Sequence, residues 1–242
     1  MHPRLQESPD SPLNNVRIWT TQIESFLPAE VDELKAALDS TERARAARFH
    51  FEHDQKNYVA TRGLLRLLLG ATLNERGSKL VLGYGEHGKP FLTRNDQPSS
   101  AVHFNVSHSG GWAMFAVSRG GEIGLDLESA ERLKRSQGNL DQLAARVLSP
   151  NELAIWQALP DTSTRTTAFL RAWTRKEAYA KATGRGLRDE TMGVEVALDA
   201  AAPQSSLRLD TAGKSWLLRD IWAPAGFCAA VAVEQRSGSN LK

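Results

Sequence analysis

The stretch WTRKEAYAKATGRGL, residues 173–187, has apolar and charged side chains at helical spacing and two glycines near its end, which predicts an amphipathic helix that stops at Gly184. On a helix, Trp173, Glu177 and Lys181 form one stripe, with Lys176 beside it. A surface helix with a solvated charged face satisfies this pattern, since a Glu177 to Lys181 pair contributes only about 0.3 kcal/mol. A helix that brings an acid and a base to a reaction site satisfies it equally well.

The composition describes a globular chain of 242 residues, 41% of them hydrophobic, which is enough to bury a substantial core. The 30 basic and 28 acidic residues nearly balance, so no overall field favours nucleic acid as a partner. We see neither the apolar core of a signal peptide nor a run long enough to cross a bilayer. We therefore expect a cytoplasmic protein without a nucleic-acid or membrane partner.

Periodicity predicts an α+β fold of two lobes. Residues 16–23 alternate like a strand, residues 40–49 and 55–73 have helical spacing, and four strand-like pieces follow up to residue 118. A second series of strand, helices and strands begins at residue 122, and its later strands are expected at 193–199, 206–210, 216–222 and 227–234. The predicted units are a polar leader (1–13), an N-terminal lobe (14–118), a C-terminal lobe carrying the metal site (119–235) and a flexible tail (236–242).

The segment GYGEHGKP, residues 83–90, matches two nucleotide-binding patterns without their structural context. Pro90 stands where a P-loop needs Ser or Thr, it has no N–H to offer a phosphate, and a strand-like segment follows it. The segment therefore predicts a hairpin turn that presents His87 and Lys89. A solvated tip and a phosphate contact through Lys89 both remain open.

The segment GLDLE, residues 124–128, alternates apolar and acidic residues. In a strand, Asp126 and Glu128 project from one face, while the two leucines project from the other. Two carboxylates on a rigid strand are the kind of oxygen ligands that Mg²⁺ takes while it keeps positions open for phosphates. An exposed strand face with no ligand is the alternative.

Two further motifs flank this strand in the sequence. FNVSHSGGW, residues 104–112, places Asn105, Ser107 and His108 at a strand end, where they could contact an anion. LSPNELAIW, residues 148–156, has the serine, proline and glutamate spacing of a capping box, which gives Glu152 a complete structural explanation.

FNVSHS, GLDLE and WTRKEAYAKATGRGL, in this order and at these separations, closely resemble the three signature motifs of 4'-phosphopantetheinyl transferases of the surfactin (Sfp) type. GKP and the segment YVATRGLLR, residues 58–66, are similar to that family's first lobe, and the resemblance covers most of residues 14–235. It implies two similar α+β lobes in a pseudo-twofold arrangement, with the active site at their interface. The implied reaction moves 4'-phosphopantetheine from coenzyme A to a serine of an apo acyl or peptidyl carrier protein, for example in secondary metabolite biosynthesis, and releases adenosine 3',5'-bisphosphate.

The resemblance also implies residue roles. Magnesium, with manganese as a substitute, would be held by Asp126, Glu128 and Glu177, and Glu152 is a further candidate ligand despite its capping role. Glu177 and Lys181 are the expected catalytic residues, with Glu177 preferred over His108 as general base. The expected coenzyme A contacts are Arg62, Lys89, Ser107, His108, Lys176 and Lys181, and Arg66 is a less securely aligned candidate.

Two other functions remain open at this point. A different Mg²⁺-dependent phosphoryl or nucleotidyl transferase would use the same acids without any carrier protein. A catalytically silent carrier-binding module would need neither the acids nor the lysines. Because two lobes in one chain can build the site, we expect a monomer.

Overall fold

The structure is a computed structural model that describes residues 2–9, 11, 14–94, 97–99, 102–131, 140–186, 193–198, 206–211 and 213–235. Its helices are α1 (Pro28–Lys35), α2 (Ser40–Ala46), α3 (Glu52–Leu73), α5 (Leu140–Val147), α6 (Pro150–Gln157) and α7 (Thr162–Thr183). Its strands are β1 (Gln6–Glu7), β2 (Val16–Gln22), β3 (Leu82–Tyr84), β4 (Pro90–Arg94), β5 (Gln97–Pro98), β6 (His103–Ser109), β7 (Trp112–Ser118), β8 (Ile123–Ser129), β9 (Ser206–Thr211), β10 (Lys214–Asp220) and β11 (Phe227–Gln235).

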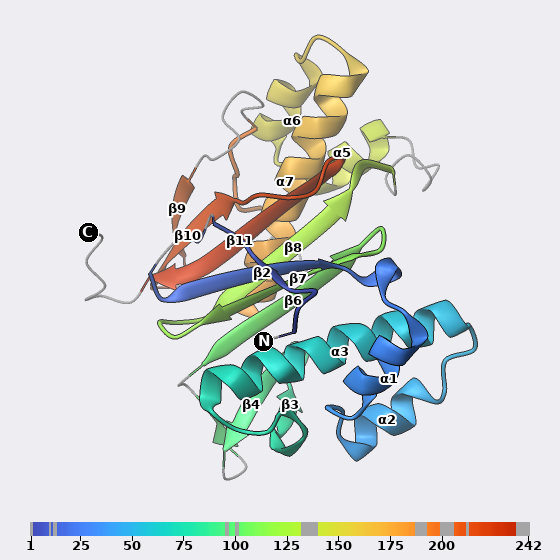
Figure 1. Cartoon of the computed structure of the whole chain (residues 1–242). Coiled ribbons are helices and arrows are strands. Elements are labelled where there is room, and N and C mark those ends of the chain that lie inside the picture. The colour runs from blue at the N-terminus through green and yellow to red at the C-terminus, as the bar shows by residue number, and fades with distance from the viewer. Residues whose placement is uncertain are drawn as a thin grey trace.

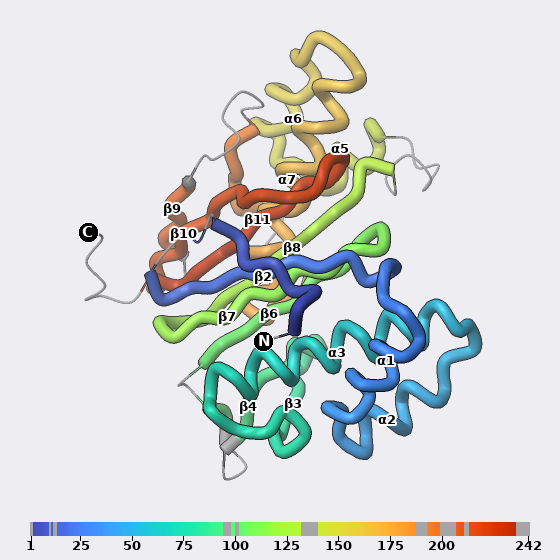
Figure 2. Tube along the Cα trace, in the orientation of Figure 1, coloured from blue at the N-terminus to red at the C-terminus, as the bar shows by residue number. Residues whose placement is uncertain are grey.

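Two four-stranded antiparallel sheets form the centre of the molecule (Figure 1). The first has the order β1-β2-β7-β6 and the second has the order β8-β11-β10-β9, while β3, β4 and β5 form a small separate sheet. Helix α3 lies along the first sheet, and α5, α6 and α7 lie on the side of the second sheet (Figure 2). The expected α+β fold with two lobes is therefore confirmed.

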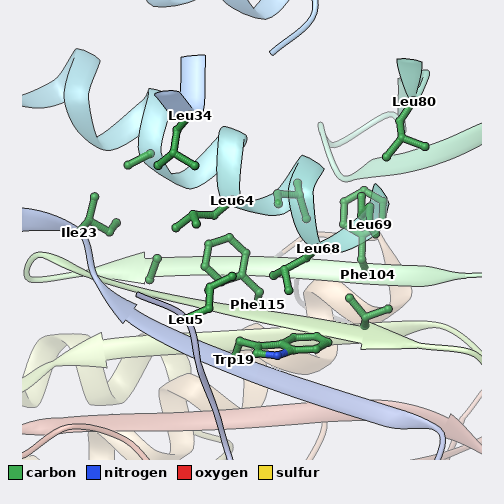
Figure 3. Packing of buried hydrophobic residues seen from close by; sticks show 14 of the residues in the cluster. Leu5, Trp19, Ile23, Leu34, Leu64, Leu68, Leu69, Leu80, Phe104 and Phe115 are labelled. Atoms are coloured by element: carbon green, nitrogen blue, oxygen red, sulfur yellow. The ribbon is translucent and has the colours of Figure 1, made fainter. Parts of the chain in front are cut away.

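Three hydrophobic clusters hold these layers together. Leucines of α3, such as Leu64 and Leu68, pack on Trp19, Phe104 and Phe115 of the first sheet (Figure 3). A second cluster joins α5, α6 and α7 to the second sheet. The third cluster joins β2 and β7 to β8 and β11 and thus fills the space between the two sheets. The lobes share this core, so the geometry of a site at their interface is fixed by packing.

Helix α7 lies unusually close to β8 because a glycine stands at the crossing point. A Cβ atom added to Gly124 would lie 2.0 Å from the carbonyl oxygen of Ala178 and 2.3 Å from the nitrogen of Ala182. The helix begins at Thr162, where the Asp161 side chain accepts a hydrogen bond from the Thr164 N–H, and ends at Gly184 with φ 69°. The strand with Asp126 and the helix with Glu177 are thereby brought together.

The predicted strands and helices are found with shifted ends, except for one. Residues 193–198 form no strand, and their backbone instead bonds to side chains: Val194 and Ala197 accept from Lys176 and Arg175, and Val196 donates to Glu152. The strand predicted at 193–199 is therefore wrong over the described residues 193–198, because polar side chains of α6 and α7 satisfy this backbone.

The N-terminal leader is part of the fold, whereas the predicted boundary between the lobes is not tested by the structure. Residues 6 and 7, expected in a polar leader, pair with β2, and Leu5 is buried in the first core. The lobe boundary at residues 118 and 119 stays a prediction, and the tail at 236–242 lies outside the described residues. None of the helices in the described part of the chain has the length and apolar character needed to cross a bilayer.

Candidate active site

A ladder of side chains joins β6 of the first sheet to β8 of the second. The acceptors are Asn105 Oδ1, Ser107 Oγ and Ser109 Oγ, and they take the N–H groups of Leu125, Leu127 and Ser129 at 2.9, 3.2 and 3.3 Å. Every second residue of a strand faces the same side, so one face of β6 supplies all three acceptors. We call Asn105, Ser107 and Ser109 the seam. It fixes the strand that carries the acids.

Asp126 is the centre of the site, and its two carboxylate oxygens have different surroundings. Oδ1 lies 2.6 Å from Lys181 Nζ and accepts a hydrogen bond of 3.0 Å from Ser107 Oγ. Lys181 also donates to Ser107 Oγ at 3.1 Å. Oδ2 is buried, and no described residue gives it a hydrogen bond. A buried carboxylate oxygen without a partner is costly, which marks Oδ2 as a candidate ligand atom.

Glu128 and Glu177 complete the acidic side of the site. Glu128 Oε2 accepts a hydrogen bond of 3.1 Å from Ser109 of the seam. Burial raises the pKa of Glu177; Lys181 opposes this effect, and the Asp126 and Glu128 carboxylates add to it. Burial and the neighbouring Asp126 and Glu128 carboxylates thus both disfavour the charged form of Glu177.

The donor chemistry of this site fits a divalent cation. Three carboxylates, one with an unpartnered buried oxygen, are the oxygen ligands that Mg²⁺ prefers. Within the described ranges, however, no three His, Cys, Asp or Glu side chains are already gathered closely enough to hold a metal ion. Lys181 supplies the positive charge at Asp126 instead, so cation binding needs side-chain rearrangement.

Two adjoining cavities receive several of the predicted coenzyme A contacts. A cavity of about 240 Å³ is bordered by Lys89, Glu177 and Lys181. A second cavity, of about 400 Å³, is bordered by Arg62 and His108. Both cavities share the wall formed by Pro90, Asn105 and Val106. A ligand longer than either cavity could therefore extend from the acids to the second cavity, past β6.

Ser107 contacts other protein groups in place of an open ligand site. We expected it to contact the nucleotide, but its hydroxyl is engaged with Asp126, Lys181 and the backbone of β8. Its side chain is buried, because β6 turns this face toward the second lobe. In this structure Ser107 holds the acid in place.

Lys89 does not form a solvated tip. The turn between β3 and β4 is the expected hairpin, but the Lys89 side chain is only 17% exposed. Its Nζ lies 2.7 Å from Glu122 Oε2 and 3.0 Å from the carbonyl oxygen of Ala182. Burial lowers the pKa of Lys89, and the Glu122 carboxylate opposes this effect. Sequence reasoning missed Glu122, which is not part of any motif.

Glu152 and Lys176 lie in a different place from the one expected. Both side chains are buried and form an ion pair with each other at 2.8 Å. Glu152 also accepts from the N–H groups of Ser149 and Val196, and Lys176 donates to the carbonyl of Val194. The roles expected for Glu152 as a metal ligand and for Lys176 as a coenzyme A contact are not supported, because each charge neutralises the other.

Arg66 is likewise engaged elsewhere. Its side chain is fully buried and paired with Asp39 and Glu42, and it donates to the carbonyls of Gly77 and Leu80. It therefore fastens α3 to the elements around it rather than reaching a ligand. Arg62, one turn earlier, instead borders the second cavity and donates to Tyr84 Oη at 2.9 Å.

The arrangement agrees with comparisons to known proteins. Residues 122–232 match the model of the 4'-phosphopantetheinyl transferase superfamily, and residues 25–120 match that of the N-terminal part of 4'-phosphopantetheinyl transferases. The chain belongs to the 4'-phosphopantetheinyl transferase superfamily, and it is an enzyme of this class.

Three relatives illustrate the similarity of this chain to known transferases. It is 35% identical to the 4'-phosphopantetheinyl transferase HetI of Nostoc sp. over 220 residues, which cover 91% of this chain and 88% of HetI. A 4'-phosphopantetheinyl transferase of Bacillus subtilis is 31% identical over 159 residues, or 65% of each chain. The L-aminoadipate-semialdehyde dehydrogenase-phosphopantetheinyl transferase of Homo sapiens is 27% identical over 233 residues, which cover 91% of this chain and 75% of that one.

Proposed function

We propose that this enzyme, as an Sfp-type member of its class, transfers 4'-phosphopantetheine from coenzyme A to a serine of an acyl or peptidyl carrier protein in a Mg²⁺-dependent reaction. The observation that carries the proposal is the state of Asp126: Oδ1 is engaged by Lys181 and Ser107, while Oδ2 is buried and free of hydrogen bonds among the described residues. Asp126, Glu128 and Glu177 would hold the cation. When bound, a divalent cation would neutralise charge on the pyrophosphate oxygens.

The protein's own residues supply the remaining chemistry. The carrier serine hydroxyl gives its proton to the Glu177 carboxylate, and its oxygen bonds to the phosphorus next to pantetheine. The bond from that phosphorus to the bridging pyrophosphate oxygen breaks, and adenosine 3',5'-bisphosphate leaves with that oxygen. Glu177 borders the 240 Å³ cavity beside Lys181, so its carboxylate lies where it can accept the serine proton. Lys181 borders the same cavity and faces the developing charge.

The adjoining cavities support a placement for the rest of coenzyme A. Lys89 and Lys181 would meet the pyrophosphate in the 240 Å³ cavity, and Arg62 and His108 would meet the nucleotide in the 400 Å³ cavity. We further propose that the enzyme is a cytoplasmic monomer, since residues of both lobes of one chain border the 240 Å³ cavity.

Intact-mass spectrometry tests the proposal. An apo carrier protein is incubated with the enzyme, coenzyme A and Mg²⁺, with an EDTA sample and Asp126→Ala alongside. A gain of one phosphopantetheine, abolished by EDTA and by Asp126→Ala, is the expected result. No coenzyme A binding by calorimetry and no mass gain on several carriers would overturn it.

Glu177→Gln tests the general base separately. The variant should keep coenzyme A binding, because glutamine retains the size and one acceptor oxygen, while turnover falls by at least about 10²-fold. Turnover equal to wild type would exclude Glu177 as the base and leave the transfer reaction itself untouched.

A further inference from the structure

We propose that Glu122 is a positioning residue for the transfer reaction: backed by His103, it holds the ammonium group of Lys89 at the junction of the two lobes, at the edge of the cavity that contains Glu177 and Lys181. This inference rests on the proposed function, because it assigns a purpose to the placement of Lys89. Glu122 belongs to none of the three motifs and does not touch the reacting atoms.

Lys89 stands between two cavities. It borders the 240 Å³ cavity with Glu177 and Lys181, and it also borders a third cavity of about 550 Å³ that contains Glu122 and His103. The lysine therefore separates the reaction site from a neighbouring space lined by side chains such as Phe104 and Trp216. Without a fixed partner, its long side chain could place the charge on either side.

Two contacts set the position of the Lys89 ammonium group. Lys89 Nζ lies 2.7 Å from Glu122 Oε2 and 3.0 Å from the carbonyl oxygen of Ala182, in the last turn of α7. A helix C-terminus attracts a cation through its unpaired carbonyls. The hairpin turn of the N-terminal lobe is thereby tied to the helix that carries Glu177 and Lys181.

Glu122 is itself held from several sides. Its Oε1 lies 3.1 Å from His103 Nδ1 on β6. Its backbone N–H donates to the Glu234 side chain, and its carbonyl accepts from the Glu234 N–H. A carboxylate with both oxygens engaged and its backbone anchored can fix the direction of a flexible lysine, which a solvated carboxylate cannot do.

The charge of Glu122 matters as well as its position. Lys89 is largely withdrawn from water, so its ammonium form is disfavoured unless an anion lies nearby. Glu122 supplies that anion. A neutral glutamine would keep an acceptor oxygen but would hold the lysine less firmly and leave its charge uncompensated.

The test is steady-state kinetics with coenzyme A varied at saturating carrier protein. Glu122→Gln should raise KM for coenzyme A about tenfold with kcat within about twofold, because Lys89 contacts the donor before and during transfer. In the Lys89→Gln background, Glu122→Gln should change KM for coenzyme A by less than twofold. Lys35→Gln is the control: this exposed lysine of α1 borders none of the three cavities, and the KM of this variant for coenzyme A should stay within twofold of wild type.

His103→Asn is measured in parallel in case Glu122→Gln unfolds. It removes the contact behind Glu122 and should raise KM in the same direction by a smaller factor. Unchanged KM in folded Glu122→Gln, or equal effects with and without Lys89, would overturn the inference. If Lys89→Gln binds coenzyme A like wild type, the role proposed for Glu122 is wrong, but the transfer reaction is unaffected. If wild type neither binds coenzyme A nor transfers phosphopantetheine, the proposed function is wrong.

Discussion

Asp126 has one carboxylate oxygen engaged and one left without a described hydrogen-bond partner, at a point where Glu128 and Glu177 add further negative charge. Such an arrangement does little for the fold. The attraction of Lys181 is offset by repulsion among the acids and by the burial of Oδ2. This balance is typical of a residue kept for its chemistry.

Asp126→Asn should therefore separate activity from stability. We expect transfer to fall by at least about 10²-fold, because asparagine is a weaker cation ligand than aspartate and a weaker partner for Lys181. The free energy of unfolding should fall by less than the roughly 3–5 kcal/mol typical of a broken buried ion pair, because Lys181 stays partly exposed and the repulsion among the acids is relieved. Intact-mass assays and urea unfolding measure the two quantities.

Asp32→Asn, at an exposed position of α1, serves as the control and should leave both transfer and the free energy of unfolding unchanged. If Asp126→Asn kept full transfer, Asp126 could not be a ligand of an essential cation. A loss of several kcal/mol would mean that Asp126 stabilises the fold.

Helix α7 and strand β8 bring the acids together only because Gly124 permits their close approach. In Gly124→Ala, the new methyl group would overlap the backbone of Ala178 and Ala182. We expect the helix to shift, the free energy of unfolding to fall by about 1–3 kcal/mol, and transfer to fall by about 10²-fold as Glu177 and Lys181 move.

Gly85→Ala is the matched glycine substitution, since its methyl group would meet only the carbonyl oxygen of Lys89, at 3.7 Å. Its urea midpoint should stay close to that of wild type. A Gly124→Ala protein with wild-type stability and wild-type transfer would show that β8 and α7 need no such contact.

Helices α6 and α7 are joined by the buried pair of Glu152 and Lys176. Removing one partner leaves a buried charge, so Glu152→Gln and Lys176→Met should each lower the free energy of unfolding by about 3–5 kcal/mol. The double variant should be destabilised by less than the sum of the two. Urea unfolding of the four proteins measures this coupling.

The same variants test the metal role expected for Glu152 from the sequence. At a temperature where Glu152→Gln is folded, the Mg²⁺ concentration for half-maximal transfer should equal that of wild type. A clear increase in this concentration, with little loss of stability, would return Glu152 to the metal site.

The junction of the lobes carries a pH-dependent contribution to stability. Although burial alone would raise it, the pKa of Glu122 is lowered to about 2 by the hydrogen bond from His103 and by Lys89. A lowered carboxyl pKa stabilises the folded state above pH 4.5, and this stability is lost as pH falls from about 4.5 to about 2. The Glu122 side chain is 36% exposed, so screening reduces the effect to on the order of 1–2 kcal/mol.

Glu122→Gln should therefore lose less free energy of unfolding than wild type between pH 5 and pH 3. Urea unfolding at both pH values gives the comparison, with equal m-values as the check on two-state behaviour. An identical acid loss in both proteins would show that Glu122 contributes nothing to it.

Much of the whole molecule was predictable from periodicity and motifs. The strands around Asp126, the helix of Glu177 and the two-lobe α+β fold follow from local patterns of apolar residues. The contacts of polar side chains were less predictable from the sequence. Ser107, Glu152 and Lys176 have the right type and spacing for ligand contacts, yet their partners come from β8, α6 and α7 and depend on how these elements pack. The contact of Glu122 with Lys89 likewise joins residues 33 positions apart and leaves no pattern in the sequence.

The seam between β6 and β8 aligns these two strands through three side chains, whereas an ordinary ladder of backbone hydrogen bonds forms with almost any sequence. A substitution in the seam is therefore expected to shift β8 against β6 while the core between the sheets stays packed. Ser107 is part of this seam and also donates a hydrogen bond to Asp126. Any shift of β8 against β6 therefore also moves the Asp126 carboxylate. A protein in which β8 is misaligned against β6 is therefore expected to be inactive, so transfer activity indicates that the two sheets have assembled correctly.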